Sequence, residues 1–373
     1  MRLHPIDGGD PRAVLEALPA ALDGARPLAL GFAPEPGNEV PDGTAVVIAT
    51  SGSSGIPKRV ILSAEALRAS AAATAQRIGA GQWMLALPAG YIAGVQVIGR
   101  SLLAGRAPVL LEGRFTAEAF RRATGRLRSD ADRYVSLVPA QLSTLLDAAE
   151  HDPGIRDALV SYRTVLVGGQ ALPAVLARRA HEAGARIVRT YGSSETGGGC
   201  VYDGVPLDGV RLQEVGGEIR IAGAHLATGY LGDAALTASA FPADEAGVRW
   251  YRTGDTGVVS DDGSLRVTGR IDNVIVSGGV NVSLDRVERA VHGIPGLEHA
   301  VVVGVPDERW GEASVVVTAP PVHESLWEAV RERVADEIGR PARPSRLVVV
   351  PEVPMLASGK PDREALRRML REP

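Results

Sequence analysis

The stretch AVVIATSGSSGIPK, residues 45–58, joins an apolar run to a loop that is rich in glycine and hydroxyl groups. Residues 45–49 are short and β-branched, which is typical of a buried strand. Residues 50–58 form the loop and residues 63–77 read as a helix, so we expect a strand, a loop and a helix in this order. Backbone N–H groups and hydroxyls in such a loop can bind phosphate, and a helix N-terminus favours anions. The alternative is a plain flexible connector, because the Walker A spacing is absent.

Alternating strands and helices extend on from this unit and indicate an α/β fold class. The other short apolar runs that we predict as strands are residues 84–87, 109–111, 135–138 and 164–167, and residues 117–128 read as another helix. From about Val210 the predicted strands become shorter and the turns tighter, as at residues 217–222 and 250–252. A hairpin is expected to turn at Asp262-Gly263, and this region is predicted to be a small β-rich subdomain.

A second, α+β unit is predicted beyond Arg270. Ser283 is a suitable N-cap for a helix that ends at Gly293. Strands are expected at residues 300–303, 314–318 and 347–350, and a helix at residues 324–338. We therefore predict a large N-terminal domain, residues 1–270, and a small C-terminal domain, residues 271–373, with residues 268–279 as the junction.

Composition excludes several classes of function. The content of 45% hydrophobic and 23% charged residues is that of an ordinary soluble globular protein. A net charge of −4 without a long basic run argues against a nucleic-acid partner. No apolar run approaches the ~20 residues of a membrane helix, and the polar N-terminus does not resemble a secretory signal. Cys200 is the single cysteine, so we expect a reducing, cytoplasmic location.

Lysine is rare in this chain. Lys and Arg together number 40, yet only Lys58 and Lys360 are lysines, and both lie in glycine-containing loops. An ammonium is a compact point charge, whereas a guanidinium is a broad planar fork. A narrow site that places one cation between small anions would accept Lys and resist Arg, so both lysines are candidate functional residues.

Six motifs in sequence order resemble those of the adenylate-forming superfamily of acyl- and aryl-CoA ligases, adenylation domains and luciferases. They are TSGSSGIPK (50–58), VGGQ (167–170), YGSSET (191–196), YRTGD (251–255), GRIDN (269–273) with its continuation SGG (277–279), and SGK (358–360). The resemblance implies that a carboxylate attacks the α-phosphate of ATP, with Mg²⁺ as cofactor and CoA as co-substrate. Catalysis would then be mostly positioning and charge neutralisation.

The resemblance also assigns roles to single residues. The implied ATP- and AMP-binding set is Thr50, Ser51, Gly52, Ser53, Ser54, Gly55, Lys58, Gly169, Gln170, Tyr191, Gly192, Ser193, Asp255 and Arg270. Lys360 would bridge the carboxylate and the α-phosphate, Ser194 would face the α-phosphate, and Glu195 would hold Mg²⁺. Taken singly, Tyr191 could equally be a core or turn aromatic, and Asp255 a residue of an Asx turn.

Domain movement is a further expectation from this family. Its small, mobile C-terminal domain rotates about an aspartate after the first half-reaction, and Asp272 matches that hinge. The turn residues Ser277, Gly278 and Gly279 would then line the approach of the CoA thiol. A simple loop before the helix at Ser283 is compatible with this role.

The acid substrate is suggested by the local sequence. YGSSETGGGCVYDGVPLDG (191–209) closely resembles the o-succinylbenzoate–CoA ligases of menaquinone biosynthesis, and only about 50 residues precede the phosphate loop, as in some of them. Arg100 interrupts an apolar stretch, where burial is costly without an anion, and could face the second carboxylate of this acid; its stem could equally snorkel to water. Tyr91 stands where much of the family has His, and Gly197 and Gly198 would leave room for a bulky aryl acid.

Two other functions remain open from sequence. A free-standing adenylation domain that loads a carrier protein would use the same first step. A nucleotide-binding protein that is no longer catalytic is less compatible with the presence of Lys360, Glu195 and Asp255. The expected partners are a small carboxylic acid, ATP and CoA, and a homodimer is possible.

Overall fold

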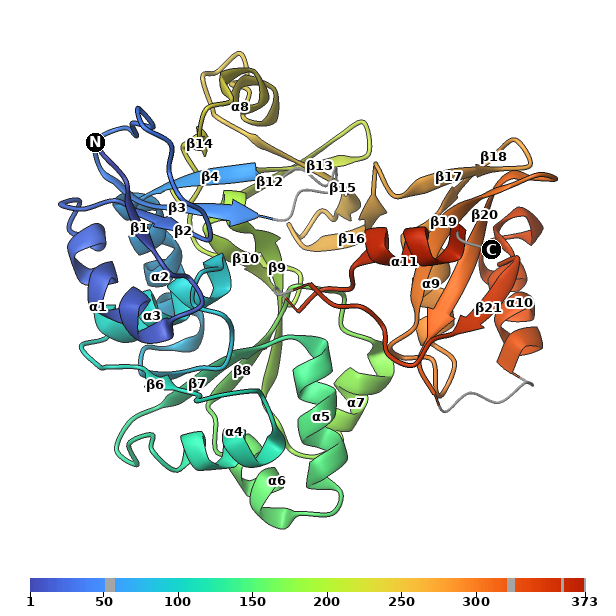
Figure 1. The fold of residues 1–373 in the computed structure, drawn as a ribbon, viewed down its shortest axis with the longest axis horizontal. Helices are drawn as coiled ribbons and strands as arrows, with labels where there is room; N and C mark the ends of the chain where they lie inside the picture. Colours follow the sequence, from blue (N-terminus) through green and yellow to red (C-terminus); the bar gives the residue numbers. More distant parts are fainter. Residues whose placement is uncertain (51–57, 321–325, 357–358, 372–373) are drawn as a thin grey trace.

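The computed structural model describes residues 1–50, 58–320, 326–356 and 359–371. Within these ranges the chain forms four β-sheets with helices packed around them (Figure 1). The predicted α/β class is confirmed. No helix in this part of the chain has the length and apolarity needed to cross a bilayer.

The first sheet carries the two ends of the glycine-rich loop. Its strands are, in spatial order, β1 (His4–Ile6), β2 (Leu28–Leu30), β3 (Thr44–Thr50), β4 (Lys58–Ser63) and β14 (Gly229–Tyr230). β3 and β4 are antiparallel, and Thr50 pairs with Lys58. The expected order of strand, loop and helix is therefore wrong, because β4 follows the loop and helix α2 (Ala64–Ile78) begins only after it. Ser63 caps α2 by accepting a hydrogen bond from Ala66 N at 3.0 Å.

The second sheet is mostly parallel. Its spatial order is β11 (Val205–Pro206), β10 (Gly198–Tyr202), β9 (Ile187–Ser193), β8 (Thr164–Val167), β7 (Arg133–Leu137), β5 (Gln82–Leu85) and β6 (Val109–Leu110). All four residues of β8 are buried, as expected for a parallel strand covered on both faces. Helices α1 (Pro11–Leu22), α3 (Ile92–Leu103), α4 (Ala117–Thr124), α5 (Pro139–Ala149), α6 (Pro153–Val160) and α7 (Ala174–Glu182) accompany these two sheets. Ligands of such sheets bind at the carboxyl ends of the strands, where β8 and β9 lead into Gly169 and Glu195.

The third sheet is antiparallel and forms the predicted β-rich region. Its strands are β12 (Arg211–Val215), β13 (Glu218–Ala222), β15 (Tyr251–Val259) and β16 (Leu265–Arg270), with helix α8 (Ala234–Ala240) before β15. The predicted hairpin at Asp262-Gly263 is confirmed, because Val259 pairs with Leu265 across it. β15 is longer than predicted and includes the whole YRTGD motif, so Asp255 lies within a strand.

The fourth sheet belongs to the C-terminal part of the chain. It contains β18 (Val280–Ser283), β17 (Val274–Ser277), β20 (Gly311–Thr318), β19 (Val301–Asp307) and β21 (Arg346–Val349), with helices α9 (Leu284–His292), α10 (Leu326–Glu337) and α11 (Arg363–Arg371). The predicted helix after Ser283 is confirmed as α9. Ser277 pairs with Val280, so the segment Ser277-Gly278-Gly279 is the turn of a β-hairpin and not a loop before a helix.

The segment between β21 and α11 connects the fourth sheet to the second. Figure 1 shows it reach back from the fourth sheet to the middle of the molecule. There the side-chain amide of Gln170, just after β8, donates a hydrogen bond of 2.8 Å to the carbonyl oxygen of Gly359. A Cβ atom on Gly359 would lie 3.5 Å from Val138, which follows β7. The C-terminal segment is thereby held at the carboxyl edge of the parallel sheet.

Candidate active site

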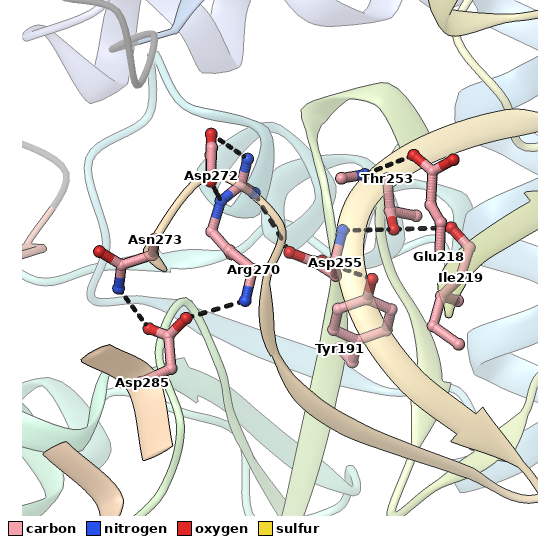
Figure 2. A network of polar contacts seen from close by, with 10 residues as sticks. Tyr191, Glu218, Ile219, Thr253, Asp255, Arg270, Asp272, Asn273 and Asp285 are labelled. Atoms are coloured by element: carbon pink, nitrogen blue, oxygen red, sulfur yellow. Dashed lines mark hydrogen bonds and ion pairs between the residues drawn. The ribbon is translucent and has the colours of Figure 1, made fainter. Parts of the chain in front are cut away.

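A half-buried carboxylate in the middle of β15, that of Asp255, is held by donors from two other strands. The hydroxyl of Tyr191, on β9, donates to Asp255 Oδ2 at 2.6 Å, and Arg270 Nη1, at the end of β16, donates to Asp255 Oδ1 at 3.1 Å (Figure 2). Burial raises the pKa of Asp255, while Tyr191 and Arg270 oppose this. Burial and the charge of Asp255 raise the pKa of Tyr191, which keeps its hydroxyl a donor. A carboxylate has about four acceptor positions, so Asp255 can still accept from a ligand hydroxyl.

Near Asp255, hydrogen bonds from side chains take the place of some backbone hydrogen bonds between β13 and β15. Thr253 Oγ1 donates to Ile219 O at 2.7 Å and accepts from Asp255 N at 3.0 Å. Gly254 N donates to the buried Glu218 at 3.2 Å. Gly254 has a positive φ of 69°, which a residue with a side chain rarely adopts. The TGD turn of the strand is therefore fixed from β13, and this sets the direction of the Asp255 side chain.

The predicted hinge lies beside this carboxylate. Arg270 binds Asp272 through two hydrogen bonds, from Nε at 2.7 Å and from Nη2 at 2.9 Å. The hydrogen bond with Asp272 is the main cause that raises the pKa of Arg270. Asp285, in the first turn of α9, accepts from Arg270 N and from the Asn273 side chain, both at 2.8 Å (Figure 2). The end of the third sheet and the start of the fourth are thus joined by one polar network.

A second cluster contains Glu195 and Lys58. Glu195 lies in the short 3₁₀ helix η1 (Ser194–Thr196) that follows β9, and it is buried. The hydroxyl of Tyr230, on β14, donates to Glu195 Oε1 at 3.0 Å. The ammonium of Lys58 lies 5.6 Å from the centroid of the same Tyr230 ring. Because β14 pairs with β4, which begins at Lys58, strand pairing places Tyr230 near Lys58, and the hydroxyl of Tyr230 reaches Glu195.

Lys360 lies in the C-terminal segment, next to Gly359, whose carbonyl accepts the hydrogen bond from Gln170. A bridge between Met355 and Pro361 closes the turn that carries it. Part of the residue is exposed, yet loss of water around the ammonium lowers the pKa of Lys360; the negative charges of Glu195 and Asp255 oppose this shift. Lys360, from the C-terminal segment, therefore shares one electrostatic environment with the two carboxylates of the N-terminal sheets.

A third region lies between α3 and the start of β10. Gly197 and Gly198 have positive φ values of 60° and 103°. Gln96, on α3, donates from Nε2 to Gly197 O at 2.7 Å, and Ser70 Oγ, on α2, donates to the same oxygen at 3.2 Å. A Cβ atom on Gly198 would lie 3.3 Å from the Gln96 side chain. Tyr91 is the N-cap of α3 and is half-buried.

Arg100 lies one helical turn after Gln96 on α3. The residue is only 8% exposed. Its guanidinium therefore does not extend into bulk water, which was one of the two alternatives that the sequence left open. Its guanidinium lies 5.4 Å from the centroid of the Trp83 ring. Its Nε has no hydrogen-bond partner among the residues that the structure describes. A buried guanidinium with a free donor is suited to an anionic ligand.

The structure brings together many of the predicted residues and separates others. One contact network joins Tyr191, Asp255, Arg270 and Asp272, and a second joins Glu195 and Lys58 through Tyr230. Gln170 binds Gly359, the residue before Lys360. The nearby predicted residues Thr50, Gly169, Gly192, Ser193 and Ser194 lie at the ends of β3, β8 and β9. Ser51, Gly52, Ser53, Ser54 and Gly55 lie outside the described residues. The turn Ser277-Gly278-Gly279 is elsewhere, against Trp310 in the turn between β19 and β20, and Gly278 N donates to Trp310 O at 2.9 Å.

Sequence reasoning missed three residues that shape this site. Tyr230 holds Glu195, Glu218 holds the backbone at Gly254, and Gln96 holds the Gly197 carbonyl. Gln96 interrupts the same apolar stretch as Arg100, four residues earlier, so the signal that pointed to Arg100 was present for it too. Tyr230 and Glu218 carry no comparable local signal.

His225 gives the region behind Gly197 a pH-dependent contribution to stability. It is buried, and burial lowers its pKa to about 4. An unfolded histidine has a pKa of about 6.5, so between these values the unfolded chain binds the extra proton and stability falls as the pH decreases. We expect the free energy of unfolding to decrease by about 2–3 kcal/mol between pH 7 and pH 4.5 through this residue alone.

Urea denaturation of the wild type and of His225→Gln at both pH values measures this contribution. The glutamine of the variant does not titrate. On acidification the variant should therefore lose about 2–3 kcal/mol less of its free energy of unfolding than the wild type does. Equal losses in the two proteins would contradict the assignment.

Comparison with known proteins identifies the family. The family model described as AMP-binding enzyme matches residues 9–231, and that described as AMP-binding enzyme C-terminal domain matches residues 286–360. A probable 2-succinylbenzoate–CoA ligase of Mycobacterium tuberculosis is 40% identical over 383 residues, covering 98% of this chain and 97% of the relative. The 2-succinylbenzoate–CoA ligase of Escherichia coli (strain K12) is 31% identical, covering 85% of this chain and 67% of the relative.

Solved structures agree with these sequence matches. A variant of E. coli MenE with bound OSB-AMS superposes with a TM-score of 0.72 at 27% identity, covering 88% of this chain and 69% of that chain. The o-succinylbenzoate CoA synthetase of Bacillus subtilis in complex with OSB-AMP gives a TM-score of 0.74 at 22% identity, covering 99% of this chain and 83% of that chain. At this low identity, the second similarity shows the fold alone. Since a family model covers more than half of the chain and a relative matches nearly all of it, the chain belongs to the family of AMP-binding enzymes.

Proposed function

We propose that this enzyme is an ATP-dependent 2-succinylbenzoate–CoA ligase that forms an acyl-adenylate and then the CoA thioester. In the first step a carboxylate oxygen attacks the α-phosphorus of ATP and pyrophosphate leaves. In the second step the sulfur of the CoA thiolate attacks the acyl carbon and AMP leaves. The observation that carries the proposal is the hydrogen bond from Gln170 to Gly359, which holds the segment of Lys360 at the carboxyl edge of the parallel sheet, where β9 leads into Glu195. The names of the similar proteins support the choice of acid.

Each cluster has a task in the first step. Asp255, held by Tyr191 and Arg270, would accept hydrogen bonds from the ribose hydroxyls of the nucleotide. Lys58, with Thr50 and the loop between them, would face the β- and γ-phosphates. Lys360 would neutralise charge where the carboxylate meets the α-phosphate, because both reactants are anions.

The Glu195 cluster fits a magnesium ion. One carboxylate oxygen of Glu195 accepts from Tyr230, and no hydrogen bond to the other is seen among the described residues. No cluster of three or more acidic, His or Cys ligands occurs within the described ranges. Mg²⁺ typically binds one or two carboxylates together with substrate phosphates and water, so a single buried Glu beside a phosphate site is a suitable donor set. Such an ion would neutralise charge on the phosphates.

The small domain, residues 271–373, would rotate against the large domain, residues 1–270, between the two steps and present its opposite face to the site. Asp272 would be the hinge, and the ion pair between Arg270 and Asp272 would stabilise the arrangement in which Lys360 is in place. After rotation the turn Ser277-Gly278-Gly279 would approach the acyl-adenylate and admit CoA. A homodimer stays a prediction.

A pyrophosphate-release assay over a panel of carboxylic acids, with and without CoA, tests the proposal. We expect 2-succinylbenzoate to give the highest kcat/KM and to yield the thioester when CoA is present. A flat response to 2-succinylbenzoate would refute the choice of acid. Adenylate formation without transfer to CoA would favour a free-standing adenylation domain.

Arg100 is expected to bind the second carboxylate of this acid. A hydrogen bond to a charged group is worth about 1.5–3 kcal/mol, so Arg100→Met should raise KM for 2-succinylbenzoate by about 10- to 100-fold. An aryl acid that lacks the second carboxylate should be affected much less, and Arg100→Lys should keep part of the affinity. Equal losses for both acids would show that Arg100 acts only through its packing against Trp83.

A further inference from the structure

An open cleft lies between β16 and α9. It has a volume of about 470 Å³. Its lining includes three arginines: Arg266 from β16, and Arg286 and Arg289 from α9. Thr268 and Glu337 complete its polar wall. Clefts of roughly 300–1,000 Å³ are typical of small-molecule sites.

The arginines of this cleft have no carboxylate partner among the residues that the structure describes. Arg289 Nη2 donates to Thr268 O at 3.0 Å, which fixes one guanidinium against β16. Arg266 and Arg286 form no ion pair within the described ranges. Three positive charges therefore converge on one concave surface.

The neighbouring acidic residues are already engaged. Glu337 pairs with Arg333 at 2.9 Å. Asp285 accepts hydrogen bonds from Arg270 N and Asn273, and Glu288 pairs with Arg363 at 2.8 Å. The repulsion among the three guanidiniums is thus not relieved by the protein itself, and an anion in the cleft would relieve it.

We propose that this cleft binds a small anion carrying two or more phosphate groups. Guanidinium groups bind phosphate oxygens through pairs of parallel hydrogen bonds, and three of them match the charge of a di- or triphosphate. Because β16 leads into the hinge and α9 follows it, the bound anion contacts both of the predicted domains. It therefore stabilises the arrangement that holds Lys360 in place, and it opposes the domain rotation proposed for the second step.

Calorimetric titration with inorganic tripolyphosphate tests the site. Lys58→Ala protein is used throughout, so that binding at the phosphate loop is weakened. We expect one binding site, and its Kd should become at least about 10-fold weaker when Arg286→Gln and Arg289→Gln are combined, because each substitution removes a charge-assisted hydrogen bond to phosphate. Arg178→Gln, which removes an exposed charge on α7, is the matched control and should leave Kd unchanged.

Thermal unfolding confirms that the variants fold; if the double variant does not, Arg266→Gln on β16 replaces it. Unchanged affinity in the double variant, or an equal loss in Arg178→Gln, would overturn the proposal. Competition with CoA distinguishes two sources of the phosphate groups. If CoA displaces tripolyphosphate, the cleft binds the phosphates of CoA. If CoA does not displace it, the cleft binds a separate polyphosphate. Binding is measured without the acid, so failure of the proposed ligase activity would not affect this result.

Discussion

Replacing Lys360 by alanine is expected to slow acyl-adenylate formation by about a hundred- to a thousand-fold, which is the cost of removing one preorganised charge-stabilising group from an active site. The side chain shares its environment with Glu195 and Asp255, and Gln170 holds the turn that presents it. Its charge is needed when two anions are brought together. It has no task in the attack of a thiol on an adenylate that is already formed.

Measuring the two half-reactions separately tests this assignment. Single-turnover pyrophosphate release reports the first step, and thioester formation from supplied acyl-adenylate and CoA reports the second. Lys360→Ala should impair the first and spare the second. If both survive, Lys360 is not the catalytic cation; if both are lost, its role is structural.

The shape of the cation should also matter. Lys360→Arg is expected to have almost as little adenylation activity as Lys360→Ala, because the planar fork of a guanidinium does not fit where a compact ammonium bridges two oxygens. Lys58→Arg should keep part of its activity, since Lys58 would face the more open leaving pyrophosphate. This contrast would rank the two lysines of a chain whose Lys and Arg residues number 40, with Lys360 the more demanding position.

The lowered pKa of Lys360 predicts how the rate of adenylation depends on pH. Because desolvation lowers this pKa from its usual value, the charged form is lost at a lower pH than for an ordinary lysine. Adenylation should therefore decline on the alkaline side before pH 10.4, the ordinary pKa of lysine. The thioester step from supplied adenylate should lack this decline.

Local patterns predicted the elements that are long or clearly bounded. Helix α9 begins at its predicted cap, Ser283, and β8 has its predicted bounds. The hairpin of β17 and β18 was missed because its two strands have only four residues each and flank a Gly pair that reads equally well as a loop. β4 was missed because the loop was expected to run directly into the helix, so the residues between Lys58 and Ser63 were predicted as no element.

Motifs predicted the residues of the site but not their partners. Tyr191, Asp255 and Arg270 meet as the family pattern implied. The contact of Tyr230 with Glu195 spans 35 residues and depends on the pairing of the two-residue strand β14 with β4. No periodicity or spacing encodes such a long-range pairing. The position of Lys360 likewise depends on how the C-terminal segment packs, which no local pattern determines.

Glu195→Gln is expected to lower the rate of adenylation by about a hundred-fold or more at ordinary Mg²⁺ concentrations. The substitution keeps the size of the side chain and its capacity to accept from Tyr230, but it removes the negative charge that would bind the cation. A charged ligand is a major part of the affinity of a hard cation for an oxygen site. The loss should therefore be reduced by raising Mg²⁺, and a Mg²⁺ titration of the adenylation rate measures this shift.

Tyr230→Phe separates the charge of Glu195 from its orientation. The buried carboxylate of Glu195 keeps its charge but loses the hydroxyl donor that lies 3.0 Å away. Loss of a hydrogen bond to a charged group costs about 1.5–3 kcal/mol, so the rate of adenylation should fall by about 10- to 100-fold. Because burial and the charge of Glu195 raise the pKa of Tyr230, its hydroxyl donates throughout the working pH range, and this loss should not vary with pH. Tyr230→Phe should alter the rate with little change in the Mg²⁺ midpoint, whereas Glu195→Gln should shift the midpoint. If both variants shift it equally, Tyr230 orients the carboxylate for the metal; if neither does, Glu195 is not a magnesium ligand.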